Sequence, residues 1–384
     1  MNERLELTGL DGSNPLGFLA ALGTLAELSR EADLNCRMGW AFVGGVWNPH
    51  VLAQGLLKAS EVVELLATRL CVGAISTAGG EALEQQLDAA DAAQMDAKRA
   101  VKNAQDEIKS RKLRGKERDA AVLAEVEPLI AERNVRQANW LKLLEQASPS
   151  PELALGKDPA APADHFQFTA RRIVAQTLTA PAERGTADLI AAFGNEAVFD
   201  AKTNRVMPTP FCFVTGSGHQ YFLQTVRDLL CHVDAARLRQ ALFEPRPHED
   251  GLFSLRWDPV EDRRYSLMWA DPTASGNKAK TNWALNLLAY RGLQLLPSMP
   301  AGRRLATTGF ARRGGRLEWT WPVWTPPLDV DVVRSLLARR DLQDDEPNRR
   351  KLAAIGIAEI FRSVRIQVGN PPLHKLNFSP ATAV

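Results

Sequence analysis

The chain has 384 residues, of which 45% are hydrophobic and 24% are charged, and its formal net charge is +2. This length and composition predict a globular protein with two or three modest domains, or one large domain carrying an insertion. We expect no membrane span and no signal peptide, and therefore a cytoplasmic location, because no apolar run is long enough and the first residues are polar. The four cysteines lie far apart, so we expect reduced thiols and no structural zinc site.

A turn followed by a buried helix is predicted near the N-terminus, after an opening strand at Arg4–Thr8. Ser13 or Asn14 can cap the helix, and Pro15 suits its first position. Leucines then recur every third residue over 16–25, with alanines and a glycine between them. This pattern indicates a helix that is buried on most sides and has another backbone packed against its small residues.

The next segment, 38–47, is rich in glycine and aromatic residues. Its alternation predicts a strand that is interrupted by a turn or bulge at Gly44 and Gly45. A second helix is predicted at Val51–Leu70. Residues 1–80 thus form the N-terminal α/β part of the body.

The composition changes abruptly after residue 80. Segment 81–146 is rich in alanine, carries 12 Lys and Arg against 13 Asp and Glu, and has one aromatic residue, Trp140. Gly115 suits a break between two helices, so we predict a long helical hairpin inserted at 81–147. Two roles remain open for it, a spacer or dimerising arm and a nucleic-acid contact. The basic residues near its tip that would make this contact are Lys112, Arg114 and Lys116.

Prolines mark 148–164 as a linker, after which 165–384 is predicted to be a basic α+β domain that completes the body. Helices are predicted at 186–193, 222–233, 283–296, 330–339 and 349–361. Strands are predicted at 252–257, 265–269, 303–311, 316–321 and 364–368. Gly314 and Gly315 predict a hairpin turn because glycine accepts the positive φ that this turn needs. The predicted fold class is α+β, with mixed helices and antiparallel strands and the inserted helical hairpin.

The search for catalytic motifs is negative. Residues 276–281 lack the glycine and Gly-Lys-Thr order of a nucleotide-binding loop, and 344–346 lack the hydrophobic strand of a magnesium-binding helicase motif. Gly216–Gly218 lacks the surroundings of a serine-nucleophile turn. The six histidines show no metal-ligand spacing and no adjacent His-Asp pair. We therefore expect that the chain is not an enzyme and holds no metal or cofactor.

Positive charge is concentrated toward the C-terminus. Residues 252–384 carry 20 Lys and Arg against 12 Asp and Glu, a net charge of +8, whereas the first 251 carry 27 against 33, a net charge of −6. Arginines beside aromatic residues in turns suit phosphate binding and base stacking. The candidate residues are Arg263, Arg264, Lys278, Lys280, Arg303, Arg304, Arg312, Arg313 and Arg316. Two alternatives remain open, namely that these cations pair with nearby carboxylates and that Trp319 and Trp321 form the core of a sheet.

Four segments together resemble a known family. They are Asp-Gly-Ser-Asn-Pro-Leu-Gly-Phe-Leu-Ala-Ala-Leu-Gly at 11–23, the Pro-Thr-Pro-Phe and Gly-Ser-Gly motifs within 208–218, Arg-Trp-Asp-Pro-Val-Glu-Asp-Arg-Arg-Tyr-Ser-Leu at 256–267, and Thr-Thr-Gly-Phe with Trp-Thr-Trp-Pro-Val-Trp within 307–324. In these segments the chain is similar to accessory proteins of type I-G (formerly I-U) CRISPR systems. Those proteins are described as an extension of the helicase-nuclease and are distantly similar to the large subunit of the surveillance complex. The resemblance covers both ends of the chain but not its middle third.

The resemblance implies a non-catalytic nucleic-acid-binding subunit or accessory factor of a type I-G CRISPR interference complex. In such complexes base pairing by guide RNA supplies sequence specificity, and the proteins mostly hold nucleic-acid backbones. The implied partners are the surveillance-complex subunits, the helicase-nuclease, DNA and guide RNA. The chain lacks every motor motif of the helicase-nuclease and is shorter than the large subunit. The alternative is a protein–protein adaptor within the same apparatus that makes no nucleic-acid contact.

Overall fold

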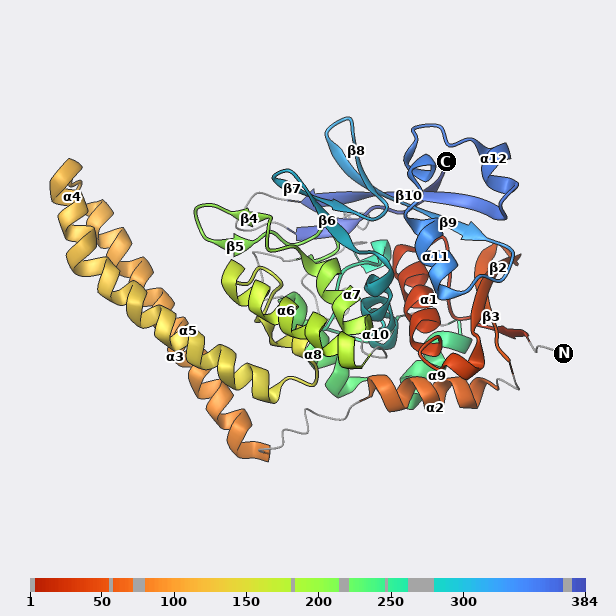
Figure 1. Cartoon of the computed structure of the whole chain (residues 1–384), viewed down its shortest axis with the longest axis horizontal. Coiled ribbons are helices and arrows are strands. Elements are labelled where there is room, and N and C mark those ends of the chain that lie inside the picture. The colour runs from red at the N-terminus through yellow and green to blue at the C-terminus, as the bar shows by residue number, and fades with distance from the viewer. Residues whose placement is uncertain are drawn as a thin grey trace, which may run out of the picture. The chain divides into compact units, whose positions relative to one another are not determined.

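The chain combines helices with small antiparallel sheets, which confirms the predicted α+β class (Figure 1). The computed structural model describes residues 4–54, 58–71, 80–180, 184–213, 221–245, 248–261, 280–368 and 375–384. The chain divides into two compact units. One unit consists of residues 1–74 and 157–384, and the other of residues 75–156.

The N-terminal sheet has the strand order β1-β3-β2, and its strands are β1 (Arg4–Glu6), β2 (Arg37–Val43) and β3 (Val46–Leu52). Gly44 and Gly45, with φ of +60° and +89°, form the turn between β2 and β3, as predicted. The predicted helix at 51–70 is wrong at its start, since β3 pairs with both neighbouring strands through residue 52. Helix α2 covers only Ala59–Leu70.

The predicted buried helix is α1 (Pro15–Leu28), and every residue in it is buried. Its first turn is capped by Asn14, whose Oδ1 accepts a hydrogen bond of 2.8 Å from the Leu16 amide. Helix α10 (Trp283–Gly292) lies beside α1 (Figure 1). A Cβ added at Gly23 would lie 1.8 Å from the carbonyl oxygen of Leu288, so only glycine permits this close helix contact.

The C-terminal sheet has the strand order β11-β10-β9-β8, and β12 also pairs with β10. Its strands are β8 (Phe310–Arg313), β9 (Arg316–Trp324), β10 (Ile357–Val368), β11 (Lys375–Phe378) and β12 (Thr382–Ala383). Trp319 and Trp321 on β9 have no exposed surface and pack around Phe18 of α1. The interpretation of these tryptophans as core residues is therefore confirmed, and they cannot stack on a base.

Three further predicted elements differ from the structure. Residues 252–257 form no strand, and Leu252 and Arg256 have positive φ. The predicted strand at 303–311 is two strands, β7 (Arg304–Thr307) and β8, because Gly309 turns the backbone with φ of +79°. The predicted helix at 349–361 ends early as α12 (Arg349–Ala353), and β10 follows the positive φ of Gly356. The predicted strand at 265–269 lies outside the described residues.

The first unit contains five further helices. They are α6 (Ala163–Thr179), α7 (Arg184–Phe193), α8 (Phe222–His232), α9 (Ala235–Phe243) and α11 (Val330–Leu337). Two smaller antiparallel pairs complete this unit, and their strands are β4 (Phe199–Asp200) with β5 (Arg205–Val206) and β6 (Ser298–Ala301) with β7.

The second unit consists mainly of α3 (Gly80–Ser110), α4 (Gly115–Ala121) and α5 (Glu127–Ala147). Two small clusters hold these helices together, one around Trp140 and the other around Val101 and Ile108. Residues 151–155 form a 3₁₀ turn in which Leu153 and Leu155 are buried. No helix in the described parts of either unit is long and apolar enough to cross a membrane.

Candidate nucleic-acid interface

The β8–β9 hairpin carries three of the predicted arginines. Gly314 and Gly315 have φ of +52° and +81°, so the two-glycine turn joins the strands as the sequence predicts. The register places Arg313 opposite Arg316 and Arg312 opposite Leu317. The turn therefore gathers three guanidinium groups at one end of the C-terminal sheet.

These three arginines have different surroundings. Arg313 is half-buried, and its guanidinium bonds to Asp345 at 2.8 Å and to Glu318 at 3.4 Å. Arg312 and Arg316 are exposed, and neither makes an ion pair with a described residue. Arg313 thus holds the hairpin to the following segment, whereas the other two present uncompensated positive charge.

A second hairpin carries Arg303 and Arg304. Gly302, with φ of +63°, belongs to the turn between β6 and β7, and Ala301 pairs with Arg304. Both arginines are exposed and form no ion pair within the described part of the chain. The strands of this hairpin form a separate two-stranded sheet, so the structure does not place its arginines in the same sheet as Arg312 and Arg316.

The other candidates of the first unit are less informative. Lys280 is exposed and precedes the isolated bridge between Asp250 and Thr281. Arg263, Arg264 and Lys278 lie outside the described residues.

In the second unit, Lys112, Arg114 and Lys116 are exposed around the turn from α3 to α4. Their neighbour Arg111 is held by carboxylates at both ends of this turn, with 2.7 Å to Glu107 and 2.7 Å to Glu125. Hydrogen bonds to these two groups raise the pKa of Arg111. The charge of Arg111 is therefore compensated within this turn. The neighbouring Lys112, Arg114 and Lys116 form no ion pair with a described residue.

Strand β10 holds two arginines that the sequence analysis missed, Arg362 and Arg365. Arg362 donates to the Thr320 hydroxyl at 3.1 Å and lies 3.9 Å from the Glu318 carboxylate. Arg365 donates to the carbonyl oxygen of Pro210 at 3.0 Å. Arg365 lies in the predicted strand at 364–368 and Arg362 lies between that strand and the predicted helix at 349–361, but the candidates were chosen among arginines in turns.

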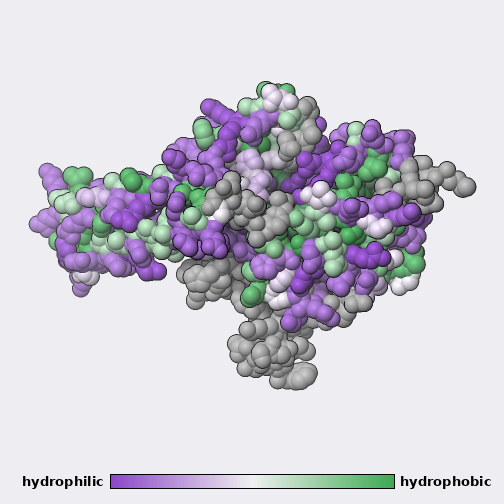
Figure 2. Space-filling view, turned by 90° about the horizontal axis from the view of Figure 1, so that it is seen from below, coloured by the Kyte–Doolittle hydropathy of each residue, from purple (hydrophilic) through white to green (hydrophobic). Residues whose placement is uncertain are grey.

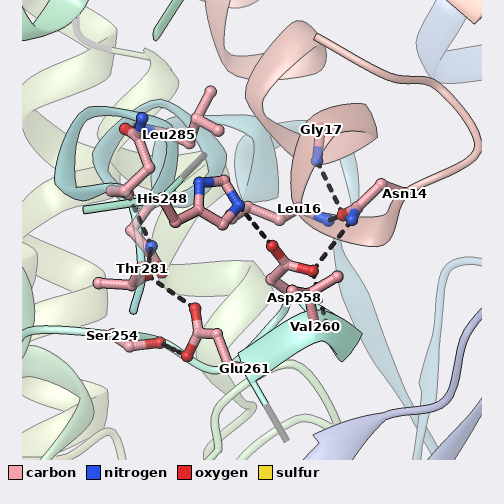
Figure 3. Close-up of polar contacts among 12 residues, drawn as sticks. Asn14, Leu16, Gly17, His248, Ser254, Asp258, Val260, Glu261, Thr281 and Leu285 are labelled. Carbon is pink, nitrogen blue, oxygen red and sulfur yellow. Dashed lines mark hydrogen bonds and ion pairs between the residues drawn. The ribbon is translucent and has the colours of Figure 1, made fainter. Parts of the chain in front are cut away.

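Two of the segments that carry the family resemblance meet in a buried polar cluster (Figure 3). Asn14, from the first segment, donates to Asp258, from the third, at 3.0 Å. His248 Nε2 lies 2.6 Å from the other oxygen of Asp258. Burial opposes ionisation of Asp258, but hydrogen bonds from His248, Asn14 and the Val260 amide lower its pKa on balance. The hydrogen bond to Asp258 raises the pKa of His248.

A second carboxyl group lies close by in the same cluster (Figure 3). Burial raises the pKa of Glu261 to about 7, although Ser254 and Thr281 both donate to it. Thr281 lies 2.7 Å from Glu261 and also accepts from Asn286 at 2.9 Å. The side chains of this cluster come from distant parts of the first unit and join them.

Each oxygen of Asp258 and of Glu261 contacts at least one protein hydrogen-bonding group. Within the described ranges no group of three or more His, Cys, Asp or Glu side chains could hold a metal ion.

Comparison with known proteins adds no family. The chain matches no model of a protein family, and it matches no curated protein.

Proposed function

We propose that this chain is a non-catalytic nucleic-acid-binding subunit or accessory factor of a type I-G CRISPR interference complex. It holds the sugar–phosphate backbone of DNA or RNA and helps to recruit the helicase-nuclease. The family context of this proposal comes from the resemblance of four sequence segments. The binding activity is supported by the structure of the basic hairpins.

The observation that carries the proposal is uncompensated arginine on two turns of the first unit. The residues are Arg303 and Arg304 on β6–β7 and Arg312 and Arg316 on β8–β9, all exposed and without an ion pair among the described residues. A guanidinium group binds phosphate oxygens through two parallel hydrogen bonds, and short glycine turns hold such groups at fixed points. Arg313, by contrast, pairs with the carboxylates of Glu318 and Asp345.

Salt-dependent binding tests this proposal. Labelled single-stranded DNA, duplex DNA and RNA would be titrated with the whole chain at several salt concentrations, and fluorescence anisotropy would be measured. We expect the affinity to fall as salt rises, with a slope of about 0.9 per phosphate contact on a duplex. Replacing Arg303, Arg304, Arg312 and Arg316 with glutamine should reduce that slope and the affinity. Absence of binding at low salt with all three probes would refute the proposal.

A second candidate function, the protein–protein adaptor, is favoured by a different surface. Helix α6 exposes Phe168, Val174 and Leu178, with exposed fractions of 62%, 50% and 81%. Exposed apolar side chains grouped on one helix are typical of protein contact sites. Hydrophilic residues cover much of the face drawn in Figure 2, with smaller hydrophobic patches among them. Capture of the helicase-nuclease that is lost with Phe168→Asp and Leu178→Asp, together with no oligonucleotide binding, would favour the adaptor.

A further inference from the structure

Arg365 on β10 is a half-buried cation that makes few polar contacts with the described residues. Its Nε donates to the Pro210 carbonyl oxygen at 3.0 Å, and its guanidinium lies 5.3 Å from the centre of the Phe213 ring. Its terminal nitrogens make no hydrogen bond to a described residue. The fork that binds oxyanions bidentately is therefore unused.

No carboxylate compensates Arg365 within the described ranges. Burial, with a smaller effect of repulsion from Arg312, lowers the pKa of Arg365 to about 10. The neighbouring Cys212 brings no negative charge at neutral pH, because burial raises the pKa of its thiol to about 12. Arg365 is still protonated at pH 7, and buried charges in proteins are normally paired because an unpaired one is costly.

The strand register places Arg312 and Arg365 on the same face of the sheet. Ser363 of β10 pairs with Trp319 of β9, and Trp319 pairs with Phe310 of β8. Arg365 lies two residues beyond Ser363, and Arg312 lies two residues beyond Phe310, so both share the face of this row. Their repulsion is consistent with this placement.

On the opposite face of the same strands, the arginines lie close to a carboxylate. There Arg313 and Arg362 lie 3.4 Å and 3.9 Å from the carboxylate of Glu318. Arg362 also donates to the Asp344 carbonyl oxygen at 2.7 Å. Two arginines on one face therefore have an acidic partner, and the two on the other face repel each other without one.

We propose that Arg312 and Arg365 together bind one phosphate group at the end of β8, β9 and β10 that is nearest to the turn at Gly314 and Gly315. This inference rests on the proposed function and deepens it, because it assigns the phosphate to a nucleic-acid backbone and adds Arg365 to the binding residues. The phosphate dianion or diester supplies the missing negative charge. The Pro210 carbonyl and the Phe213 ring orient the guanidinium of Arg365 before the ligand arrives.

The test compares four forms of the full chain, namely wild type, Arg365→Gln, Arg312→Gln and Arg313→Gln. Binding of labelled single-stranded DNA is measured by anisotropy across salt concentrations. We expect Arg365→Gln and Arg312→Gln each to weaken binding about tenfold and to lower the salt slope by about 0.7, the contribution of one phosphate on a single strand. Arg313→Gln should leave both quantities near their wild-type values.

Thermal unfolding shows whether each variant is folded, and Arg365→Lys retains the charge without the fork if Arg365→Gln does not fold. Arg365→Lys should then bind more weakly than wild type, because the bidentate geometry is lost. Competition with inorganic phosphate and with an oligonucleotide carrying neutral methylphosphonate linkages separates a free anion from a backbone. Strong competition by inorganic phosphate with equal binding of the neutral oligonucleotide would overturn the assignment to a backbone.

The experiment distinguishes failure of the phosphate site from failure of the proposed function. If wild type binds no oligonucleotide, the proposed function fails. If wild type binds and the folded variants at 312 and 365 bind equally well with unchanged salt slopes, the phosphate site fails while the proposed function stands.

Discussion

The buried polar cluster and the basic end of the C-terminal sheet differ in whether their charged groups have partners. In the cluster, Asp258 receives donors from Asn14, His248 and the Val260 amide, so that a deeply buried carboxylate stays ionised. At the end of the sheet, Arg312 and Arg365 repel each other without a described carboxylate partner. Charge that is compensated holds this fold together, and charge that is left uncompensated is available to a ligand.

Asp258→Ala should have the largest effect on stability. It leaves the imidazole of His248 and the amide of Asn14 without their acceptor in a buried site, which typically costs about 3–5 kcal/mol. Urea unfolding followed by tryptophan fluorescence measures the free energy of unfolding. Asp96→Ala is the matched control, because Asp96 forms an exposed ion pair with Arg99, with side chains 70% and 73% exposed. A change in the control below about 0.5 kcal/mol is expected, and equal effects of the two changes would contradict the structural role of Asp258.

Glu261→Gln should stabilise the protein in a pH-dependent way. The pKa of Glu261 is about 7 in the folded protein and near 4.3 in an unfolded chain. Folding therefore favours the protonated form, and the contribution of Glu261 to stability is full at low pH and is lost as pH rises from about 4 to 7. The variant cannot ionise, so its stability relative to wild type should increase by roughly 3 kcal/mol between pH 4 and pH 8.

Urea unfolding of both proteins across this pH range checks the prediction for Glu261. His248 and Asp258 titrate in both proteins, and because the charge of Glu261 also raises the pKa of His248, the difference includes this coupling. A difference in unfolding free energy that does not change with pH would show that Glu261 does not titrate in this range.

Arg313→Ala and Arg312→Ala should have opposite consequences, although the residues are neighbours. Arg313 is 15% exposed and bonds to Glu318 and Asp345, so its removal should cost about 1–2 kcal/mol of stability. It should not weaken oligonucleotide binding. Arg312→Ala should change stability by less than about 0.5 kcal/mol and weaken binding. Parallel urea unfolding and anisotropy measurements test the pair, and the same phenotype in both variants would remove the distinction between them.

Local signals were sufficient for one part of the fold. Helix α1 is predicted by the turn at 11–14, by Pro15 and by the leucine spacing. The signals for a helix cap and for a buried helix lie within a short stretch of consecutive residues. Gly314 and Gly315 predict the β8–β9 hairpin for the same reason, since the turn itself fixes the register. The residues at this hairpin could therefore be named from sequence.

Non-local contacts explain what the sequence did not reveal. The pairing of Asn14 with Asp258 spans 244 residues, and Asp345 reaches Arg313 across 32 residues, so neither can be inferred from local spacing. Strand β10 was predicted in part as a helix, because its apolar residues fit both periods until the ladder with β9 selects the strand. Arg365 lies in the part that was predicted as a strand, and it was missed because its contact with Pro210 spans 155 residues.

The basic residues at the tip of the second unit should have the smallest effect on binding. Lys112, Arg114 and Lys116 are exposed, but segment 81–146 has nearly equal numbers of acidic and basic residues, so its field is weak beyond a Debye length. We expect the triple alanine variant to weaken oligonucleotide binding by about twofold at low salt. Anisotropy titrations at two salt concentrations measure this change. The variant keeps the ion pairs of Arg111 with Glu107 and Glu125, which stabilise the turn. A loss as large as that of Arg312→Ala would instead make the tip of this unit a principal binding surface, and the arm would then act as more than a spacer.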